Sequence, residues 1–215
     1  MTGATIRFSA IVLAAGTSSR MRGVHKLLLP IGDEPLIRHT VRAVLEAKPQ
    51  ELVVVTGFQE PSIRSALAGL PIRVQSNPAF EQGQMSSVTA GLRALTRPAD
   101  AVMVCLADMA LLSSGDYRDL VEVFARRAGR SIVVPRFEGQ RGNPIIIEWS
   151  HLPVLLSSQR NLGCRKLIAD HPQEVLAYDA PHDRFVVDID TPEDYARVVR
   201  RVAFAQTQSA QGGAI

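Results

Sequence analysis

Short, unbroken runs of apolar residues are the feature of this sequence that most constrains its fold. Four of them resemble buried strands, namely SAIVLAAG at 9–16, ELVVVTG at 51–57, AVMVCLAD at 101–108 and SIVVP at 131–135, and a weaker fifth is IRVQSNP at 72–78. A strand that is apolar at nearly every position, instead of at alternate ones, is typical of a parallel sheet covered on both faces. We therefore expect a sheet with helices on each side.

Helical patterns lie between these runs. In residues 34–48, one face of the expected helix carries Leu36, Ile37, Thr40, Val41, Val44 and Leu45. Residues 86–97 and 114–127 show similar patterns. Alternation of strands and helices predicts an α/β fold, a three-layer α/β/α arrangement with a mostly parallel sheet and right-handed crossovers.

Two later segments interrupt this alternation. SIVVPRFEGQRGNPIII at 131–147 places two apolar runs around a Gly-rich polar turn, which predicts a hairpin or an extended excursion. FVVDIDTPEDYARVVRRV at 185–202 predicts a strand and then a helix, with Thr191 as N-cap, Pro192 in the first turn and Asp194 completing a capping box. Without repeats or linkers, residues 1–200 are expected to form one domain, and residues 201–215 a flexible tail.

Composition and charge exclude several function classes. The chain has 215 residues, 46% of them hydrophobic, and a formal net charge of +3, which is too small to favour nucleic acid as a partner. No apolar run has membrane-spanning length, and the residues before Ile11 do not resemble a secretory signal. The two cysteines, Cys105 and Cys164, cannot form a four-thiolate zinc site. A cytoplasmic protein with no membrane partner is expected.

The first apolar run ends in small residues that precede two cations, in SAIVLAAGTSSRMRGVHKLLLP at 9–30. Such a loop is typical of phosphate binding, because backbone N–H groups can approach an anion only where side chains are absent. It matches neither a P-loop nor the G-x-G-x-x-G fingerprint, in which Ser18 would have to be glycine. Arg20 and Lys26 follow Gly16 closely enough to reach a polyphosphate. A surface loop with incidental charges would have the same composition.

Five segments, in order, resemble a known family. LAAGTSSRMRGVHKLLLPIGDEPLIRHTV resembles the signature of nucleotidyltransferases with a glycosyltransferase-A-like, Rossmann-like fold; the later matches are NPAFEQGQMSSVTAGL, VCLADM, VPRFEGQRGNPIII and DIDTPEDY. The set is most similar to the molybdenum-cofactor nucleotidyltransferases, and LAAG, where guanylyltransferase relatives have LAGG, favours the cytidylyltransferase branch. The departures from the family pattern are His25, the absence of a proline in DMALL at 108–112, and Asn161 and Cys164 in NLGCRKLI.

The resemblance implies a reaction. A nucleoside monophosphate, CMP from CTP in the favoured version, would pass to the phosphate of molybdopterin or its molybdenum cofactor, with release of pyrophosphate. A molybdenum hydroxylase or its maturation factor would be a protein partner. Three alternatives remain open: GTP as the donor, a sugar or alditol phosphate as the acceptor, and a carrier that binds the cofactor without catalysis.

The resemblance also implies roles for individual residues. Asp108 ends a buried strand at the edge where α/β sheets bind ligands, and Mg²⁺ prefers one or two carboxylates with phosphate oxygens and water. Asp108 and Asp190 are therefore the expected Mg²⁺ ligands, and Arg20, Lys26 and Asp108 the expected catalytic residues. The expected nucleotide-binding set is Leu13, Ala14, Ala15, Gly16, Arg20, Lys26, Gly83, Ser87 and Asp108. The expected acceptor-binding set is Arg141, Asn143 and Asp188, of which Arg141 and Asn143 could equally serve only to shape their turn.

Overall fold

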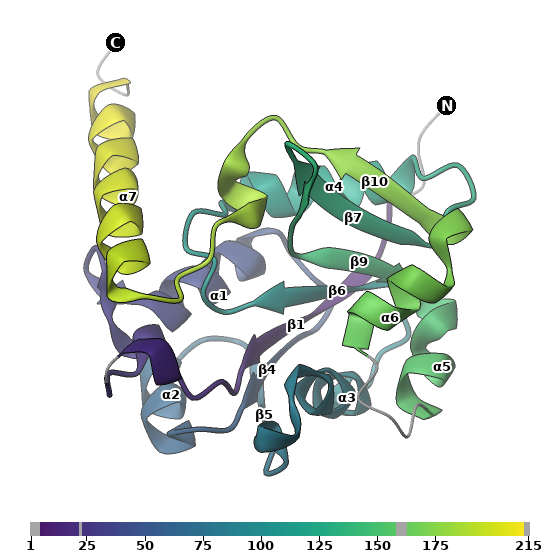
Figure 1. Ribbon diagram of the computed structural model, residues 1–215, viewed down its shortest axis with the longest axis horizontal. Helices are drawn as coiled ribbons and strands as arrows, with labels where there is room; N and C mark the ends of the chain where they lie inside the picture. The colour runs from purple at the N-terminus through teal and green to yellow at the C-terminus, as the bar shows by residue number, and fades with distance from the viewer. Residues whose placement is uncertain (1–4, 22, 158–162, 213–215) are drawn as a thin grey trace.

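The computed structural model describes residues 5–21, 23–157 and 163–212. Figure 1 shows a twisted central sheet between two layers of helices, with the far end of the C-terminal helix projecting beyond the body. The helices are α1 (Leu36–Glu46), α2 (Glu60–Ala66), α3 (Gln84–Ala94), α4 (Ser114–Ala125), α5 (Leu152–Ser157), α6 (Gly163–Asp170) and α7 (Pro192–Gly212). The strands are β1 (Phe8–Ala14), β2 (Pro30–Ile31), β3 (Glu34–Pro35), β4 (Leu52–Thr56), β5 (Arg73–Ser76), β6 (Ala101–Leu106), β7 (Ile132–Phe137), β8 (Gln140–Arg141), β9 (Ile145–Glu148) and β10 (Val175–Asp179).

The main sheet has the order β10-β7-β9-β6-β1-β4-β5, and β8 pairs with β7. The four strongest apolar runs of the sequence are β1, β4, β6 and β7, and the weaker fifth is β5. β1 lies between β4 and β6 and is parallel to both. β9 runs antiparallel between β6 and β7, so the sheet is mixed but mostly parallel, as predicted.

Both faces of the sheet are buried. Along β1, Ala10 and Val12 pack into one core with residues of α1, α4 and α7, whereas Ile11 packs into a second core with residues of α3, α5 and α6. All three β1 side chains are fully buried. Burying one large aliphatic side chain stabilises a fold by about 1.5–3 kcal/mol, and this two-sided burial explains why the strands are apolar at every position.

The hairpin prediction for residues 131–147 is confirmed. β7 turns tightly into β8, where Arg136 pairs with Arg141, and β9 then enters the sheet antiparallel to β7. The connection between β8 and β9 contains Gly142 and Asn143, and it lies at the same end of the sheet as the carboxyl end of β6, because β9 is antiparallel to β6. This topology takes a polar loop to the edge where ligands of α/β sheets bind.

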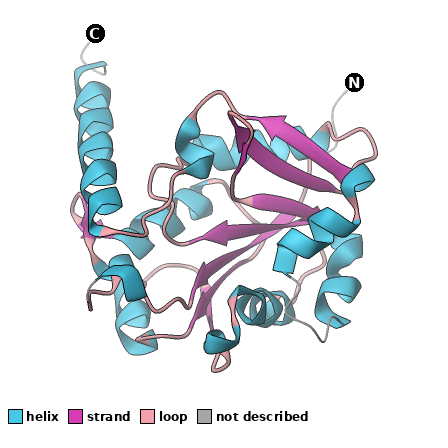
Figure 2. Cartoon of the chain, viewed as in Figure 1, coloured by secondary structure: helices cyan, strands magenta, loops and turns pink. Residues whose placement is uncertain are grey.

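The predicted strand at residues 185–190 is wrong. Asp183–Val186 forms a short 3-10 helix, and Figure 2 shows no strand between β10 and α7. The segment crosses the end of the sheet instead of entering it, and Ile189 N donates one hydrogen bond to Asp108 O at 3.2 Å. An apolar pattern alone cannot tell such a crossing from a strand.

The C-terminal segment continues the last helix. α7 continues to Gly212, so residues 201–212 are helical where the sequence suggested a flexible tail. The alanines and glutamines of this stretch are good helix formers, and the helix that precedes it supplies the nucleus from which it extends.

The start of α7 is fixed by the predicted capping box. Asp194 N donates to Thr191 Oγ1 at 3.1 Å, and Thr191 N donates to Asp194 Oδ2 at 3.0 Å. Thr191→Ala is expected to lower the free energy of unfolding by about 1 kcal/mol, the usual cost of losing an N-cap. Denaturant unfolding tests this, with the exposed Thr207→Ala in the same helix as control; equal stabilities of the two variants would contradict the assigned cap.

Candidate active site

A cavity of about 880 Å³ opens where β1 and β6 end. Its walls come from the loop after β1, the first turn of α3, the end of β6, the β8–β9 connection, the start of α6 and the crossing segment before α7. Every residue that the sequence pointed to lines this cavity: Leu13, Ala14, Ala15, Gly16, Arg20, Lys26, Gly83, Ser87, Asp108, Arg141, Asn143, Asp188 and Asp190. Segments distant in sequence therefore meet in one place.

The loop after β1 leaves backbone open to the cavity. A Cβ atom added at Gly16 would meet nothing within 4 Å, so packing within the protein does not require glycine there. Ser18 has a left-handed backbone, with φ 53°, and its Oγ accepts a hydrogen bond from Lys26 N at 3.2 Å. The loop thus turns back on itself, and the contact with Ser18 holds the backbone of Lys26 in place.

His25 anchors the same segment from behind. It is buried, stacks on Phe58 with ring centroids 5.6 Å apart, and its Nε2 lies 3.3 Å from Phe58 O. Burial lowers the pKa of His25, although the contact with the Phe58 carbonyl opposes the shift, and the charge of Lys26 lowers it further. This departure from the family pattern therefore has a structural role, which is to hold the Lys26 segment against the loop after β4.

Two cations and two carboxylates form an ion-pair network in the cavity. Lys26 Nζ donates to Asp108 Oδ2 at 2.6 Å and to Asp190 Oδ1 at 3.0 Å, while an Arg20 guanidinium nitrogen lies 2.8 Å from Asp190 Oδ2. Burial opposes the charge on Lys26, but the two carboxylates outweigh it, so the pKa of Lys26 is raised. Burial raises the pKa of Asp188, and the neighbouring Asp108 and Asp190 raise it further. The cationic side chains of Lys26 and Arg20 are thus paired with the carboxylates of Asp108 and Asp190.

The carboxylates also suit a divalent cation. Asp108 Oδ1 is buried and has no hydrogen-bond partner in the described chain, which leaves a charged oxygen unused beside the ammonium of Lys26. Among the described residues, no three His, Cys, Asp or Glu side chains form a ready-made metal site. A hard ion that takes one or two carboxylates and completes its shell with phosphate oxygens and water, as Mg²⁺ does, fits this donor set.

The crossing segment is held in place from two sides. Asn143 N donates to Phe185 O at 2.8 Å, and Gly142 admits no side chain because a Cβ would clash with the Phe185 carbonyl oxygen. On the other side, Arg184 donates to both oxygens of the buried Asp116 at the start of α4, at 2.6 and 3.1 Å. These contacts set the position of Asp188 and Asp190, a few residues further on.

The first turn of α3 forms another wall. Gly83 has φ +102°, a conformation that favours glycine, and the helix begins without a side-chain cap. Ser87 Oγ accepts a hydrogen bond from the buried Asn77 at 3.0 Å. The positive end of this helix borders the cavity and can attract an anion or an acceptor atom of a base.

Sequence reasoning missed several residues of the cavity wall. Ser18, Gln84, Met85 and Arg165 all line it. Gln84 and Met85 lie inside a segment already matched to the family, so that segment could have yielded them. Cys164 also lines the cavity, and burial raises the pKa of its thiol to about 11. Asn161 lies outside the described residues.

Comparisons with known proteins identify the family of this chain. The model of the "MobA-like NTP transferase domain" family matches residues 10–175. The purine catabolism protein PucB of Bacillus subtilis is 29% identical over 207 residues, which cover 90% of this chain and 96% of PucB. The bifunctional protein GlmU of Kineococcus radiotolerans is 37% identical over 131 residues, 59% of this chain and 26% of GlmU. The chain therefore matches about a quarter of the length of that relative.

Solved structures show the same fold. A nucleotidyl transferase from Methanothermobacter thermautotroptrophicus has a TM-score of 0.79 and 26% identity, covering 93% of this chain and 99% of that one. Rv0371c of Mycobacterium tuberculosis, in a complex with manganese, has a TM-score of 0.73 at 23% identity, covering 90% of this chain and 98% of that one; the second likeness concerns the fold alone.

No helix in the described ranges has both the length and the apolar character needed to cross a membrane. The family model covers well over half of the chain, including the loop after β1, Lys26 and Asp108. The α/β/α fold, the cavity at the ends of β1 and β6 and the match over residues 10–175 establish that this chain belongs to the MobA-like NTP transferase domain family.

Proposed function

We propose that this protein is a nucleotidyltransferase that passes a nucleoside monophosphate from a nucleoside triphosphate to a phosphorylated acceptor. The observation that carries the proposal is the meeting of Lys26 with Asp108 and Asp190 in a cavity bordered by the side-chain-free loop at Gly16. A cation that can bind a polyphosphate therefore lies within hydrogen-bonding distance of two carboxylates that can bind the metal ion of that polyphosphate. Family membership supports the same reaction.

The reaction needs positioning and charge neutralisation more than acid–base catalysis. An oxygen of the acceptor phosphate attacks the α-phosphorus, a new O–P bond forms, and the bond to the β-phosphate oxygen breaks to release pyrophosphate. The attacking oxygen is already anionic, so no side chain has to remove a proton. Catalysis then depends on holding the two phosphates in line and on stabilising the charge that grows on the leaving group.

Each residue of the network has a role in this scheme. Lys26 and Arg20 exchange their carboxylate partners for phosphate oxygens of the triphosphate, Lys26 as a point charge and Arg20 as a fork. Asp108 and Asp190 would hold Mg²⁺, which supplies positive charge to the phosphates when bound. The loop from Leu13 to Gly16 and the first turn of α3, with Gly83 and Ser87, provide the surface for the nucleoside. Arg141, Asn143 and Asp188 lie on the acceptor side.

CTP is the proposed donor, on the basis of the LAAG and RGNP motifs. In the presence of Mg²⁺, we expect CTP to bind at least tenfold more tightly than GTP, because a base edge that leaves a buried hydrogen-bonding group unpaired costs about 1–3 kcal/mol. Calorimetric titration with CTP, GTP, ATP and UTP measures this preference. Tighter binding of GTP than of CTP would contradict it.

The acceptor is proposed to be molybdopterin or its molybdenum cofactor, with a molybdenum hydroxylase or its maturation factor receiving the product. This part rests on the resemblance of the sequence motifs to molybdenum-cofactor nucleotidyltransferases. Release of pyrophosphate from CTP, measured with the molybdopterin cofactor and in parallel with sugar and alditol phosphates, identifies the acceptor. A carrier without catalytic activity would bind the cofactor and release no pyrophosphate with any of them.

A further inference from the structure

The acceptor side of the cavity carries positive charge that nothing in the described chain neutralises. Arg141, on β8, and Arg165, on α6, both line the cavity, and no carboxylate of the described residues makes an ion pair with either. Arg141 is half-buried, with Cys164 beside it. Burial lowers the pKa of Arg141, and although Cys164 opposes this, the charges of Arg165 and Arg136 lower it further.

Other partly buried arginines of this protein are paired. Arg127 donates to Glu148 at 3.0 Å, Arg184 to Asp116 at 2.6 Å, and Arg201 to Asp183 at 2.6 Å. A half-buried guanidinium without an acidic partner is costly, because desolvation of its charge is not compensated. Arg141 therefore differs from these half-buried arginines, and its charge, together with that of the exposed Arg165, is open to a counter-charge from outside the chain.

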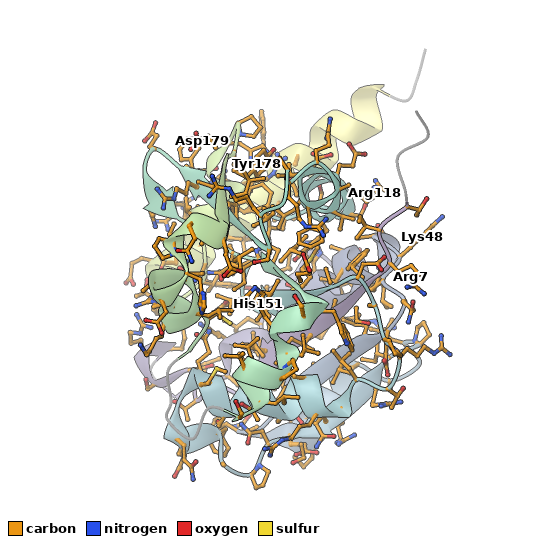
Figure 3. All side chains as sticks on the ribbon, turned by 90° about the vertical axis from the view of Figure 1, so that its right-hand side faces the viewer. Arg7, Lys48, Arg118, His151, Tyr178 and Asp179 are labelled. Carbon is orange, nitrogen blue, oxygen red and sulfur yellow. The ribbon has the colours of Figure 1, made fainter. Side chains whose placement is uncertain are left out.

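The β7–β8 hairpin places a third positive charge, that of Arg136, opposite Arg141, where a carboxylate could have neutralised it. Arg136 lies directly opposite Arg141 in the β7–β8 register and is exposed. Like charges directly opposite each other destabilise an antiparallel pair. Asp179 is the register neighbour of Arg136 in β10 and lies near the edge of the sheet (Figure 3), yet these two side chains form no ion pair in the described chain.

This cluster is separate from the Lys26 network. Lys26 contacts Asp108 and Asp190, and no ion pair of the described residues joins Arg141 or Arg165 to either of these carboxylates. The charged groups that act on Arg141 are Arg165 and Arg136. One cavity thus contains two cationic centres, of which the first is neutralised by carboxylates and the second is not.

We propose that Arg141 and Arg165, with Arg136 opposite Arg141 in the hairpin, form a second anion-binding subsite that holds an oxyanion of the acceptor, apart from the triphosphate held at Lys26 and Arg20. The guanidinium fork matches phosphate and carboxylate oxygens in pairs. The identity of the occupant as acceptor rests on the proposed function, but the subsite itself does not. It assigns the acceptor to compounds that carry a phosphate or another oxyanion for the two guanidinium groups to bind.

Titration with inorganic phosphate at constant ionic strength, followed by the NMR signals of the arginine Nε–Hε groups, tests the subsite. The signals of Arg141 and Arg165 are expected to shift saturably, and to do so within twofold of the same midpoint in Lys26→Ala. In the Lys26→Ala background, Arg141→Gln combined with Arg165→Gln removes both of these signals, and it is expected to weaken phosphate binding, measured by calorimetry, at least tenfold, or about 1.4 kcal/mol.

The matched control is Arg118→Gln, which removes an exposed charge from α4, on the opposite face of the sheet from α6 (Figure 3). It should leave the phosphate site unchanged. Because the cavity arginines repel one another, the double variant is also expected to melt no lower than the wild type, whereas a purely structural role would lower its melting temperature.

Two results would overturn the proposal. One is the absence of saturable shifts at Arg141 and Arg165. The other is a loss of Mg²⁺-dependent CTP affinity in the double variant as large as that in Lys26→Ala, which would assign these arginines to the triphosphate. If the wild type bound phosphate at this subsite but did not bind CTP, the proposed donor would be wrong and the subsite would stand.

Discussion

Lys26→Ala is expected to lower turnover by about 10²–10³-fold, because one charge contact to the transition state is worth roughly 2–4 kcal/mol. Lys26 Nζ lies between the two carboxylates that would hold the counter-ion, so no other side chain of the described network can take its place. The fold should survive, since Asp190 keeps its contact with Arg20 and both carboxylates retain some exposure to solvent. Pyrophosphate release and thermal melting measure the two quantities.

Arg20→Ala provides a second test of the same centre. Its side chain is 67% exposed, so its loss should reduce turnover in the same direction while leaving the melting temperature unchanged. Lys48→Asn is the control for removal of a lysine charge far from the cavity, because asparagine tolerates the left-handed backbone there, φ 61° (Figure 3). Near-normal turnover in both Lys26→Ala and Arg20→Ala would exclude these cations from the mechanism.

Asp108→Asn is expected to raise the Mg²⁺ requirement steeply or to abolish turnover at every Mg²⁺ concentration. The substitution keeps the shape of the side chain, and its amide oxygen can still accept from Lys26 Nζ, but it removes the negative charge of the unpartnered Oδ1. The variant should fold normally, because a side chain at the end of a strand that faces a cavity contributes little to the core. The test measures the turnover of the variant as a function of Mg²⁺ concentration, and also its melting temperature.

Asp190→Asn should behave like Asp108→Asn. The double variant should be little worse than either single one, because groups that act as a unit are not additive. Asp119→Asn, on the exposed face of α4, is the matched control. A merely structural role for Asp108 would give the opposite pattern, a lower melting temperature with an unaltered Mg²⁺ requirement.

The sequence predicted best what depends on local pattern. The buried strands of the parallel core were recognisable because two-sided burial leaves no polar position along them, and the capping box of α7 is a four-residue signal. β10 was missed because it is only half-buried at the edge of the sheet, so VLAYD carries a weak pattern. The short helices α2, α5 and α6 were missed for a similar reason, since six to eight residues give a faint helical period.

Contacts between residues that are distant in the sequence cannot be predicted from local sequence patterns. The motif resemblance selected Lys26, Asp108 and Asp190 one by one, but that a single ammonium bridges both carboxylates depends on how β1, β6 and the crossing segment meet. That no described carboxylate pairs with Arg141 is likewise a property of the folded surroundings. Arg165 was passed over because its segment was noticed only for the residues that depart from the family pattern.

The two carboxylates that Lys26 contacts lie far from it in the sequence, so they are synthesised at different times. Asp108 lies 82 positions and Asp190 lies 164 positions beyond the lysine that joins them. Chains emerge from the ribosome with the N-terminal end first, so a partly synthesised chain can already display the Gly16 loop and Lys26 while it still lacks the second carboxylate. The network is complete only when the crossing segment, in which Ile189 N donates to Asp108 O, lies on the end of β6.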